Sequence, residues 1–357
     1  MEKKLGKAVT TLLTGLLVIL AIVRLGQIRE KGPASAHQSR ILMDTVVSIR
    51  VYRGDAERID QAIETAFAEM DHLDSLLSAW KPDSDISRIN LSAGQATVPV
   101  DPRTWEAIQE IRTLSELTRG SFDLTIGAVT GLWDFSSPET APPDSGSILQ
   151  ALPLVNPGQI LLDSLHREIG LRQRGARLDP GGAAKGYIVD RAIETLWEHG
   201  VEAAVIDAGG DIGLLGQKTD GTPWKIGIRD PQDSGATIEI IEVDSGAVAT
   251  SGNYERFFIH DQIRYHHILD PKTGRPVPQV VSVTILAPTT LEADVLSTAV
   301  FVLGPDEGLR LIEQLSNIEG VIYLEGPQGL RRAASSNFPP STGKFNLSKE
   351  HLPPRRS

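Results

Sequence analysis

The sequence predicts an α+β fold in which helices flank mixed or antiparallel sheets and two halves pack closely together. Helix-type spacing of apolar residues dominates the first part of the chain, whereas strand-type alternation dominates the part after Asp190. Helices and strands do not alternate strictly, which disfavours a doubly wound parallel sheet. A chain of 357 residues with 40% hydrophobic content can bury one large core or two adjoining ones.

The first half contains one predicted strand and two predicted helices. Apolar residues alternate between positions 45 and 52, which predicts a half-buried strand. Apolar residues then recur at three- and four-residue spacing from Ile59 to Leu77, which predicts an amphipathic helix. Asp101 and Pro102 supply an N-cap and a first-turn proline for the second helix. The apolar stripe of that helix comprises Trp105, Ile108, Ile111, Leu114 and Leu117.

The second half contains mostly predicted strands, separated by glycine and proline turns. The strands are expected at residues 203–206, 224–228, 238–243 and 280–285. A helix predicted at residues 291–303 follows the last of them. Because strands follow strands without an intervening helix, this order of elements is typical of an α+β fold.

The termini are expected to lie outside the folded domain. Lysines at positions 3, 4 and 7 precede an uncharged apolar run at residues 8–23, which indicates an export signal or a retained membrane anchor within residues 1–36. The basic residues predict a cytoplasmic amino terminus, so we expect the domain at residues 37–334 on the periplasmic side of a bacterial inner membrane, anchored or secreted after cleavage. Residues 335–357 are rich in Ser, Pro, Lys and Arg and are expected to form a disordered tail.

Composition excludes several classes of function. The formal net charge is −11, and no basic stripe is present that could neutralise a run of phosphates, so we expect no nucleic-acid partner. The chain has no cysteine, which excludes disulfides, thiolate metal sites and a cysteine nucleophile. Any phosphate that the protein binds is therefore bound at a local site.

The segment DPGGAAKGYIVD, at residues 179–190, is the most informative motif. Two adjacent glycines allow backbone N–H groups to turn outward together, and Lys185 adds a positive charge at the start of a helix. These features are typical of a phosphate-binding loop. It is not a Walker loop, because Gly186 and Tyr187 follow the lysine in place of a hydroxyl residue. From this segment alone, a plain strand-turn-helix junction is the alternative.

Seven further segments accompany this loop in a fixed order along the chain. They lie at residues 43–45 (MDT), 78–90, 120–133, 207–213 (DAGGDIG), 250–256 (TSGNYER), 266–276 (HHILDPKTGRP) and 293–304. Together with the loop they resemble the FAD:protein FMN transferase (ApbE) family over nearly the whole ordered region. The resemblance implies an ApbE-like fold and a magnesium-dependent enzyme that cleaves FAD, links FMN through a phosphoester to a Thr or Ser of an acceptor protein, and releases AMP.

The resemblance implies a Mg²⁺ site and a catalytic lysine. Asp294 and Thr298 lie four residues apart on a predicted helix, so a carboxylate and a hydroxyl project from one face, and both are hard oxygen ligands. Spacing alone favours a helix-start aspartate and a packed threonine. In the family these positions carry the metal ligands, a backbone carbonyl at Gly182 is the third, and Lys185 contacts FAD and neutralises charge on its pyrophosphate.

The resemblance also implies flavin contacts, since methionine and aromatic side chains can cover a flat ring while backbone groups pair with its polar edge. The implied contacts are Met43, Trp80, Ser121, Phe122, Asp123, Lys185 and Ile268. Without the motifs, Trp80 and Phe122 would be interpreted as ordinary core residues. Asp44 stands where the family usually has glycine, so the backbone and the flavin approach at this turn are expected to differ there.

His267 lies in a segment predicted to be a strand entering a tight turn. In the family the histidine at this position is a candidate base for the acceptor hydroxyl, a role that a near-neutral pKa suits. From the sequence string alone, a hairpin with a histidine on its face is the alternative. Asp211 and Asp270 lie beside glycine and proline turns, where they either position water or metal or cap the turns.

Other functions use overlapping sets of residues. A serine hydrolase would use Ser251 with His267, but the segment is not a Gly-x-Ser-x-Gly elbow. A zinc hydrolase would use His260, His266 and His267, but the chain has no His-Glu-x-x-His helix. An FAD diphosphatase giving FMN and AMP would use water as acceptor, and a non-catalytic flavin carrier would need no metal. The acceptor that the resemblance implies is a subunit of a membrane redox complex such as Na⁺-translocating NADH:quinone reductase.

Overall fold

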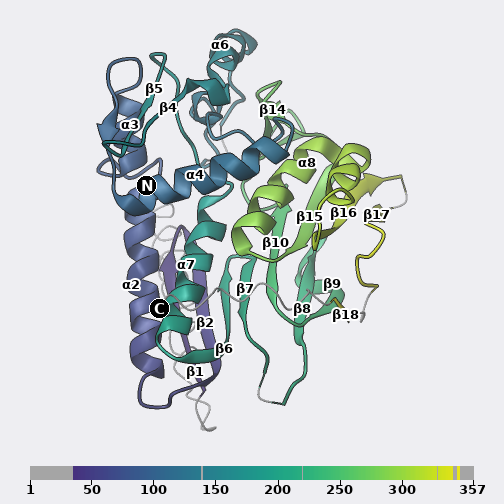
Figure 1. The fold of residues 1–357 in the computed structure, drawn as a ribbon. Helices are drawn as coiled ribbons and strands as arrows, with labels where there is room; N and C mark the ends of the chain where they lie inside the picture. The colour runs from purple at the N-terminus through teal and green to yellow at the C-terminus, as the bar shows by residue number, and fades with distance from the viewer. Residues whose placement is uncertain (1–34, 138–139, 219, 328, 341–343, 346–357) are drawn as a thin grey trace, which may run out of the picture.

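The computed structural model describes residues 35–137, 140–218, 220–327, 329–340 and 344–345 (Figure 1). Its helices are α2 (Ile59–Leu77), α3 (Asp85–Leu91), α4 (Pro102–Leu117), α5 (Gly127–Thr130), α6 (Ser145–Ala151), α7 (Ala184–Glu198) and α8 (Thr290–Ile312), with 3₁₀ turns at Leu152–Leu154 and Pro157–Gln159. Its strands are β1 (Ala36–Leu42), β2 (Thr45–Gly54), β3 (Val98–Pro99), β4 (Ile160–Asp163), β5 (Glu168–Leu171), β6 (Val201–Ala208), β7 (Asp211–Leu215), β8 (Trp224–Asp230), β9 (Asp233–Val243), β10 (Gly246–Gly252), β11 (Phe257–His260), β12 (Ile263–His266), β13 (Leu269–Asp270), β14 (Arg275–Pro276), β15 (Val280–Ala287), β16 (Glu319–Gly326), β17 (Gly329–Ala334) and β18 (Lys344–Phe345).

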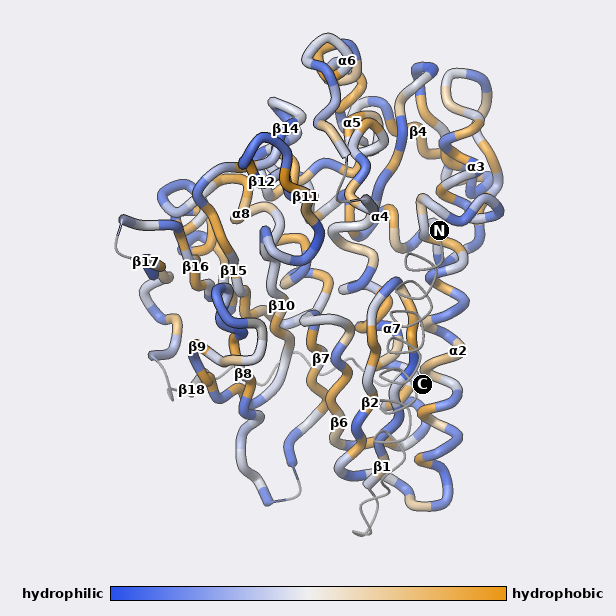
Figure 2. The backbone as a smooth tube through the Cα atoms, turned by 180° about the vertical axis from the view of Figure 1, so that it is seen from behind, coloured by the Kyte–Doolittle hydropathy of each residue, from blue (hydrophilic) through white to orange (hydrophobic). Residues whose placement is uncertain are grey.

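One eight-stranded sheet organises the fold. Its strand order is β1-β2-β6-β7-β10-β15-β16-β17, and every neighbouring pair is antiparallel. Helices α2, α7 and α8 cover one face, and the small sheet β18-β9-β8 lies on the other, with β18 parallel to β9 (Figure 1, Figure 2). The predicted α+β fold, with antiparallel and mixed sheets and flanking helices, is therefore confirmed.

The elements of the first half form where the sequence predicts them. The inward-facing apolar residues of β2 are fully buried, and the apolar stripe of α2 packs into the core. Helix α4 begins with the Asp101 carboxylate accepting the N–H of Arg103. The predicted apolar stripe of α4 includes Leu117, and this part of the prediction is wrong, because Leu117 is 46% exposed. Ser115 and Thr118 are buried there instead, because each hydroxyl donates to a backbone carbonyl of the same turn.

Three apolar clusters hold the layers together. The first lies between the sheet and helices α2 and α7, and the second lies between the sheet and α8. The third lies on the opposite face, where Trp224 of β8 packs with residues of β10, β15 and β16. One continuous sheet thus joins two cores on the same face, and α7 contacts α8 where these cores adjoin (Figure 1).

Helix α8 is longer than predicted and is bent. The predicted end at residue 303 is followed by a non-helical Gly304 (φ 75°). The chain then resumes a helical course from Pro305 to Ile312. A capping box fixes its start, since the Thr289 hydroxyl accepts the N–H of Glu292 while the Glu292 carboxylate accepts the N–H of Thr289. The predicted end of the helix therefore coincides with the bend.

Strands β1 and β2 are joined by the two-residue turn Met43-Asp44. Leu42 pairs with Thr45, and both turn residues have positive φ, 53° for Met43 and 57° for Asp44. Two successive residues of this kind are what the tightest hairpins require, and aspartate tolerates this backbone region better than most residues. Asp44 therefore occupies a tight turn, at the position where the resemblance implies glycine.

The prediction of a disordered tail is wrong for the described residues after Ala334. The Ser335 hydroxyl accepts the N–H of Gly320, Phe338 is 7% exposed, and Lys344–Phe345 forms β18 beside β9. Burial of the Phe338 ring in the third cluster and pairing of backbone groups order this stretch, although its composition is polar.

The predicted signal or anchor lies outside the described residues, which begin at residue 35. The first strand, β1, begins at Ala36, next to the predicted junction between that segment and the folded domain. Within the described ranges, none of the helices combines the length and the apolar character that crossing a bilayer requires.

Candidate active site

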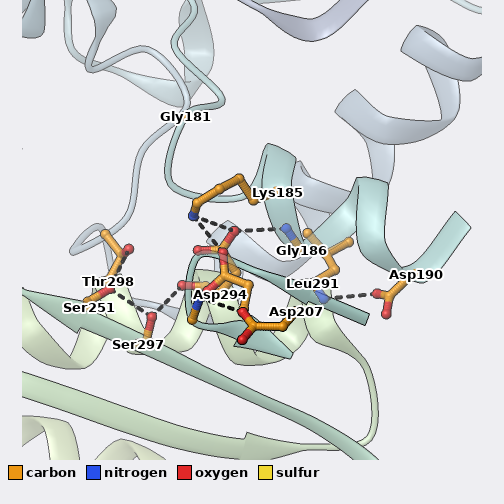
Figure 3. Close-up of polar contacts among 12 residues, drawn as sticks. Gly181, Lys185, Gly186, Asp190, Asp207, Ser251, Leu291, Asp294, Ser297 and Thr298 are labelled. Carbon is orange, nitrogen blue, oxygen red and sulfur yellow. Dashed lines mark hydrogen bonds and ion pairs between the residues drawn. The ribbon is translucent and has the colours of Figure 1, made fainter. Parts of the chain in front are cut away.

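The glycine loop leads into α7, which carries Lys185 in its first turn (Figure 3). The Asp179 carboxylate accepts the N–H of Gly181, and the carbonyl of Pro180 accepts the N–H of Ala184 at 2.8 Å. These bonds turn the chain directly before the helix begins at Ala184. The predicted helix start at the lysine is confirmed.

Helices α7 and α8 approach each other very closely at Gly186. A Cβ at this position would lie 2.5 Å from the Thr290 carbonyl oxygen and 2.8 Å from the Cβ of Asp294, so only glycine fits. The Gly186 N–H donates to Asp294 Oδ2 at 3.0 Å. One turn later, the Asp190 carboxylate accepts the N–H groups of Thr290 and Leu291 at 2.8 and 2.9 Å, and burial raises the pKa of Asp190 to about 6. These contacts fix the register of the two helices (Figure 3).

Lys185 lies between two buried carboxylates. Its Nζ donates to Asp211 Oδ2 at 2.5 Å and lies 4.0 Å from Asp294 Oδ2. Burial opposes the charged ammonium, but the two carboxylates outweigh it and raise the pKa of Lys185. Burial, together with the nearby Asp294, raises the pKa of Asp211. The ammonium thus offsets part of the negative charge of the two carboxylates, and its side chain is still 32% exposed.

Thr298 faces the glycine loop from the helical turn that follows Asp294 (Figure 3). A Cβ at Gly182 would lie 3.3 Å from Thr298 Oγ1, so the missing side chain leaves the loop backbone open to this hydroxyl. Thr298 Oγ1 also lies 3.3 Å from Ser251 Oγ, which in turn lies 2.8 Å from Ser297 Oγ. A short chain of hydroxyls therefore fixes the orientation of the threonine.

The oxygen donors at this point fit a hard divalent cation. The Asp294 carboxylate, the Thr298 hydroxyl and the backbone at Gly182 supply the kinds of oxygen that Mg²⁺ prefers, and glycine leaves room between the loop and α8. In the ranges that the structure describes, no group of three His, Cys, Asp or Glu side chains could hold a metal. A metal here would therefore depend on a single carboxylate, with hydroxyl, carbonyl and substrate oxygens completing its shell.

His267 directly follows β12 and lies opposite Arg256. The Arg256 carbonyl accepts the backbone N–H of His267 at 3.1 Å and lies 3.3 Å from its Nδ1. Because a carbonyl oxygen only accepts, Nδ1 carries the proton and the lone pair is on Nε2. Burial, followed by the positive charge of Arg256, lowers the pKa of His267 to about 4, below the near-neutral value that we expected. The ring is therefore neutral at pH 7.

Three of the implied flavin contacts, Ser121, Phe122 and Asp123, are buried in the turn after α4. Phe122 packs against the glycine loop, because its Cε2 would lie 3.2 Å from a Cβ at Gly182. The Ser121 hydroxyl and the Asp123 carboxylate form hydrogen bonds with neighbouring residues of their own segment. The hydrogen-bonding groups that this turn leaves for a ligand are therefore those of the backbone rather than these two side chains.

The remaining implied flavin contacts lie in different surroundings. Ile268 is 5% exposed and belongs to the second apolar cluster, under α8. Met43 is partly buried against the first cluster, whereas Trp80, after α2, is 66% exposed. The structure does bring together five of the predicted site residues. They are Phe122, Gly182 of the glycine loop, Lys185 of α7, and Asp294 and Thr298 of α8.

The residues of the rival sites have other partners. Ser251 lies against the hydroxyls of α8 rather than a histidine. His266 Nε2 contacts a backbone carbonyl, and His260 lies beside an exposed aspartate at the hairpin tip. The Asp270 carboxylate accepts an N–H of its own turn, so it is a turn cap. These contacts favour neither a serine hydrolase nor a zinc hydrolase.

Comparison with known proteins identifies the family. A family model described as the ApbE family matches residues 43–322. The chain belongs to the ApbE family. An FAD:protein FMN transferase from Treponema pallidum is 33% identical over 303 residues, which cover 80% of this chain and 84% of the relative. Another from Vibrio cholerae is 31% identical over 335 residues, which cover 92% of this chain and 99% of the relative.

Solved structures of ApbE proteins share the fold. The ApbE protein from Thermotoga maritima matches with a TM-score of 0.76 at 33% identity, over 84% of this chain and 97% of that chain. The flavin transferase ApbE from Vibrio cholerae matches with a TM-score of 0.74 at 29% identity, over 85% of this chain and 98% of that chain. The family predicted from the co-linear motifs is confirmed.

Sequence reasoning left the role of Asp211 open and assigned none to Asp190 or Arg256. Asp211 directly follows the Gly-Gly turn of DAGGDIG. Asp190 lies four residues after Gly186, so helical spacing puts both on the face of α7 that contacts α8. In this ApbE-family chain, two sequence signals could therefore have identified Asp211 and Asp190. They are the position of a residue within a motif and its helical spacing, rather than its residue type.

Proposed function

We infer that this chain is an FAD:protein FMN transferase, which cleaves FAD, attaches FMN through a phosphoester to a Thr or Ser of an acceptor protein, and releases AMP. The observation that carries this conclusion is the α7–α8 junction, where Lys185, Asp294 and Thr298 lie together beside the glycine loop. Phosphoryl transfer requires mainly positioning and positive charge, which this junction supplies. The relatives from Treponema pallidum and Vibrio cholerae carry the same name.

We propose that Asp294, Thr298 and the Gly182 carbonyl hold Mg²⁺. When bound, the ion would neutralise negative charge on the diphosphate of FAD. Lys185 supplies a second positive charge at the same place, and its bond to Asp211 keeps the ammonium within 4.0 Å of Asp294. The junction therefore offers charge neutralisation to a diphosphate from two sources.

The proposed reaction breaks the phosphoanhydride bond of FAD and forms a phosphoester bond to the acceptor. The acceptor hydroxyl oxygen attacks the phosphorus on the FMN side of the diphosphate, and the P–O bond to the AMP phosphate breaks. AMP leaves with the electron pair of that bond. The hydroxyl proton goes to Nε2 of His267, which holds a lone pair because Nδ1 donates to the Arg256 carbonyl.

Two alternatives use the same residues. In an FAD diphosphatase, water would take the place of the acceptor hydroxyl, and in a carrier FAD would bind without turnover. A carrier needs neither a lysine held between two carboxylates nor hard oxygen ligands at the diphosphate. These features favour an enzyme, and only the acceptor separates transfer from hydrolysis.

The location is also part of the proposal. We propose that residues 1–36 export or anchor the protein, that the domain lies on the periplasmic side of a bacterial inner membrane, and that the acceptor is a subunit of a membrane redox complex. The support is the apolar run at residues 8–23 preceded by three lysines.

The decisive experiment is single-turnover transfer from FAD to acceptor protein, with Mg²⁺ present and bound FAD titrated separately. His267→Ala should keep FAD binding and lose transfer by about 10²- to 10⁴-fold, the usual contribution of a general base. His260→Ala, at the tip of the β11–β12 hairpin, is the matched control and should transfer normally.

Three outcomes would contradict the proposal in different ways. Wild-type protein that releases FMN without labelling any acceptor would be a diphosphatase. Wild-type protein that binds FAD with no turnover would be a carrier. Normal transfer by His267→Ala would leave the transferase standing and remove the histidine as the base.

A further inference from the structure

Arg256 places a second cation next to the candidate catalytic residues. It precedes β11, and its carbonyl contacts His267, so the two residues lie opposite each other at the base of the β11–β12 hairpin. The charge of Arg256 acts on both His267 and Lys185, opposing the protonated form of each. Arg256 therefore lies beside His267, at the same end of the hairpin.

The charged partner of Arg256 in the described chain is Asp44, in the β1–β2 turn. The Asp44 carboxylate lies 3.9 Å from the guanidinium, and its side chain is 87% exposed. The turn is close to the hairpin that carries Asp211, because a Cβ at Gly209 would lie 2.5 Å from Thr45 Oγ1. Asp44 and Asp211 thus approach the same site from adjacent hairpins, each next to one cation.

The two ion pairs differ strongly in tightness. The Lys185–Asp211 pair is 2.5 Å long and Asp211 is 4% exposed, whereas the Arg256–Asp44 pair is 3.9 Å long with side chains 55% and 87% exposed. An exposed pair of this length contributes little free energy. An incoming anion can therefore displace Asp44 from Arg256 far more easily than it can displace Asp211 from Lys185.

A guanidinium suits a diphosphate better than it suits this single carboxylate. Its planar fork donates to two oxygens at once, and phosphate oxygens present that geometry. Asp44 has a positive φ of 57°, which keeps the turn tight, and its side chain adds a carboxylate there. The charge, rather than the backbone, is what the aspartate adds.

We propose that Arg256 binds the diphosphate of FAD. When no FAD is bound, Asp44 pairs with the Arg256 guanidinium, so the incoming diphosphate must displace Asp44. The proposal rests on the inferred use of FAD as substrate. Asp44 would then weaken FAD binding by a small amount, and most at low salt, where its attraction to Arg256 is least screened.

The test is a set of FAD titrations with full-length protein at low salt, for wild type, Asp44→Asn, Arg256→Gln and the double variant. Arg256→Gln should weaken FAD binding by about tenfold or more, as expected for loss of a charge-assisted bond. Asp44→Asn should tighten it by about two- to fivefold, the range for an exposed ion pair. In the Arg256→Gln background the Asp44 substitution should have no effect.

Riboflavin, which has no phosphate, is the control ligand, and its affinity should be the same in all four proteins. An unchanged FAD affinity in Asp44→Asn, or the same tightening with and without Arg256, would refute the competition. Equal weakening of FAD and riboflavin in Arg256→Gln would place the arginine at the ring. If Arg256→Gln unfolds, Arg256→Lys, which keeps the charge but loses the fork, should give an intermediate affinity.

These titrations need no acceptor protein, so they separate this proposal from the proposed function. Normal FAD binding without any transfer would refute the transferase and leave the Asp44–Arg256 competition intact. Transfer by the wild type, with FAD affinity unchanged by Asp44→Asn, would support the transferase and refute the competition.

Discussion

The phosphate end and the ring end of the candidate site differ in how much structure the protein fixes by itself. At the phosphate end, Lys185, Asp294 and Thr298 are joined by contacts between α7, α8 and the hydroxyls of β10 and α8. At the ring end, Met43 lies in a tight turn and Trp80 is 66% exposed. Changes at the phosphate end should therefore affect folding and chemistry together, whereas a change at the exposed Trp80 should affect binding alone.

The largest expected effect is that of Asp294→Asn. The amide oxygen can still accept the N–H of Gly186, so the fold should be kept, but the negative charge at the proposed Mg²⁺ site is lost. We expect transfer to fall by about 10³-fold, the scale of charge stabilisation by a bound metal. Transfer rates at several Mg²⁺ concentrations, with Asp270→Asn as the turn-cap control, measure this. Wild-type rates in Asp294→Asn would remove this end of the site from the chemistry.

Gly186→Ala tests whether the phosphate end depends on the helix junction. The added Cβ would lie 2.5 Å from a backbone carbonyl of α8, so the helices must separate. We expect the free energy of unfolding to drop by about 1–3 kcal/mol, with transfer reduced as well. Gly235→Ala, where a Cβ would meet its nearest neighbour at 3.5 Å, is the control for a glycine with room. Equal behaviour of the two variants in chemical denaturation would show that the junction is not tight.

Asp190→Asn tests the same junction through pH. An amide can satisfy only one of the two N–H groups of Thr290 and Leu291, so we expect a loss of about 1–2 kcal/mol. The pKa of Asp190 is raised to about 6, so the folded state binds this proton more tightly, and the contribution of Asp190 to stability falls as pH rises from about 4 to about 6. The variant should therefore be most destabilised, relative to wild type, near pH 4.

Urea denaturation of both proteins at pH values between about 4 and 7 gives this difference directly, since other titrating groups cancel. A difference that grows as pH rises would mean that Asp190 is stabilised as a carboxylate, contrary to its raised pKa.

The smallest expected effect is that of Trp80→Ala, at the ring end. Removing an aromatic ring from a stacking contact should weaken FAD and riboflavin binding by about three- to tenfold. Unfolding should change by less than about 0.5 kcal/mol, because the side chain is 66% exposed. Leu91→Ala, 76% exposed on α3, controls for loss of a surface apolar group. Unchanged flavin affinity would show that Trp80 does not cover the ring.

Much of the fold follows from local pattern. Strand β2, helix α2 and the first segment of α8 were predictable because their apolar periodicity agrees with the layer that each one covers. The described part of the polar tail was not, because one buried ring and a parallel strand pairing order it, and neither leaves a local signature.

The candidate site also has residues that the sequence could point to and features that it could not predict. The glycine-rich motif itself pointed to Gly182 and Lys185 as candidates. Asp294 and Thr298 were predicted only from the family resemblance, because their spacing on a helix alone favours structural roles. The burial of Ile268 and the exposure of Trp80 depend on which elements cover them, and that is decided by packing between distant segments. The lowered pKa of His267 has the same origin, since burial of the ring is its largest cause and the charge of Arg256, in the same hairpin, comes second.

The contacts of Asp190 with the start of α8 join positions about one hundred residues apart. Since α8 carries Asp294 and Thr298, a nascent chain cannot complete the phosphate end until residues near 300 have been synthesised, whatever has already folded before them. A truncated chain would keep the glycine loop and Lys185 but would lack the helix that closes the site. Diphosphate affinity would then report on completion of synthesis and folding, so misfolded or incomplete copies would not sequester FAD.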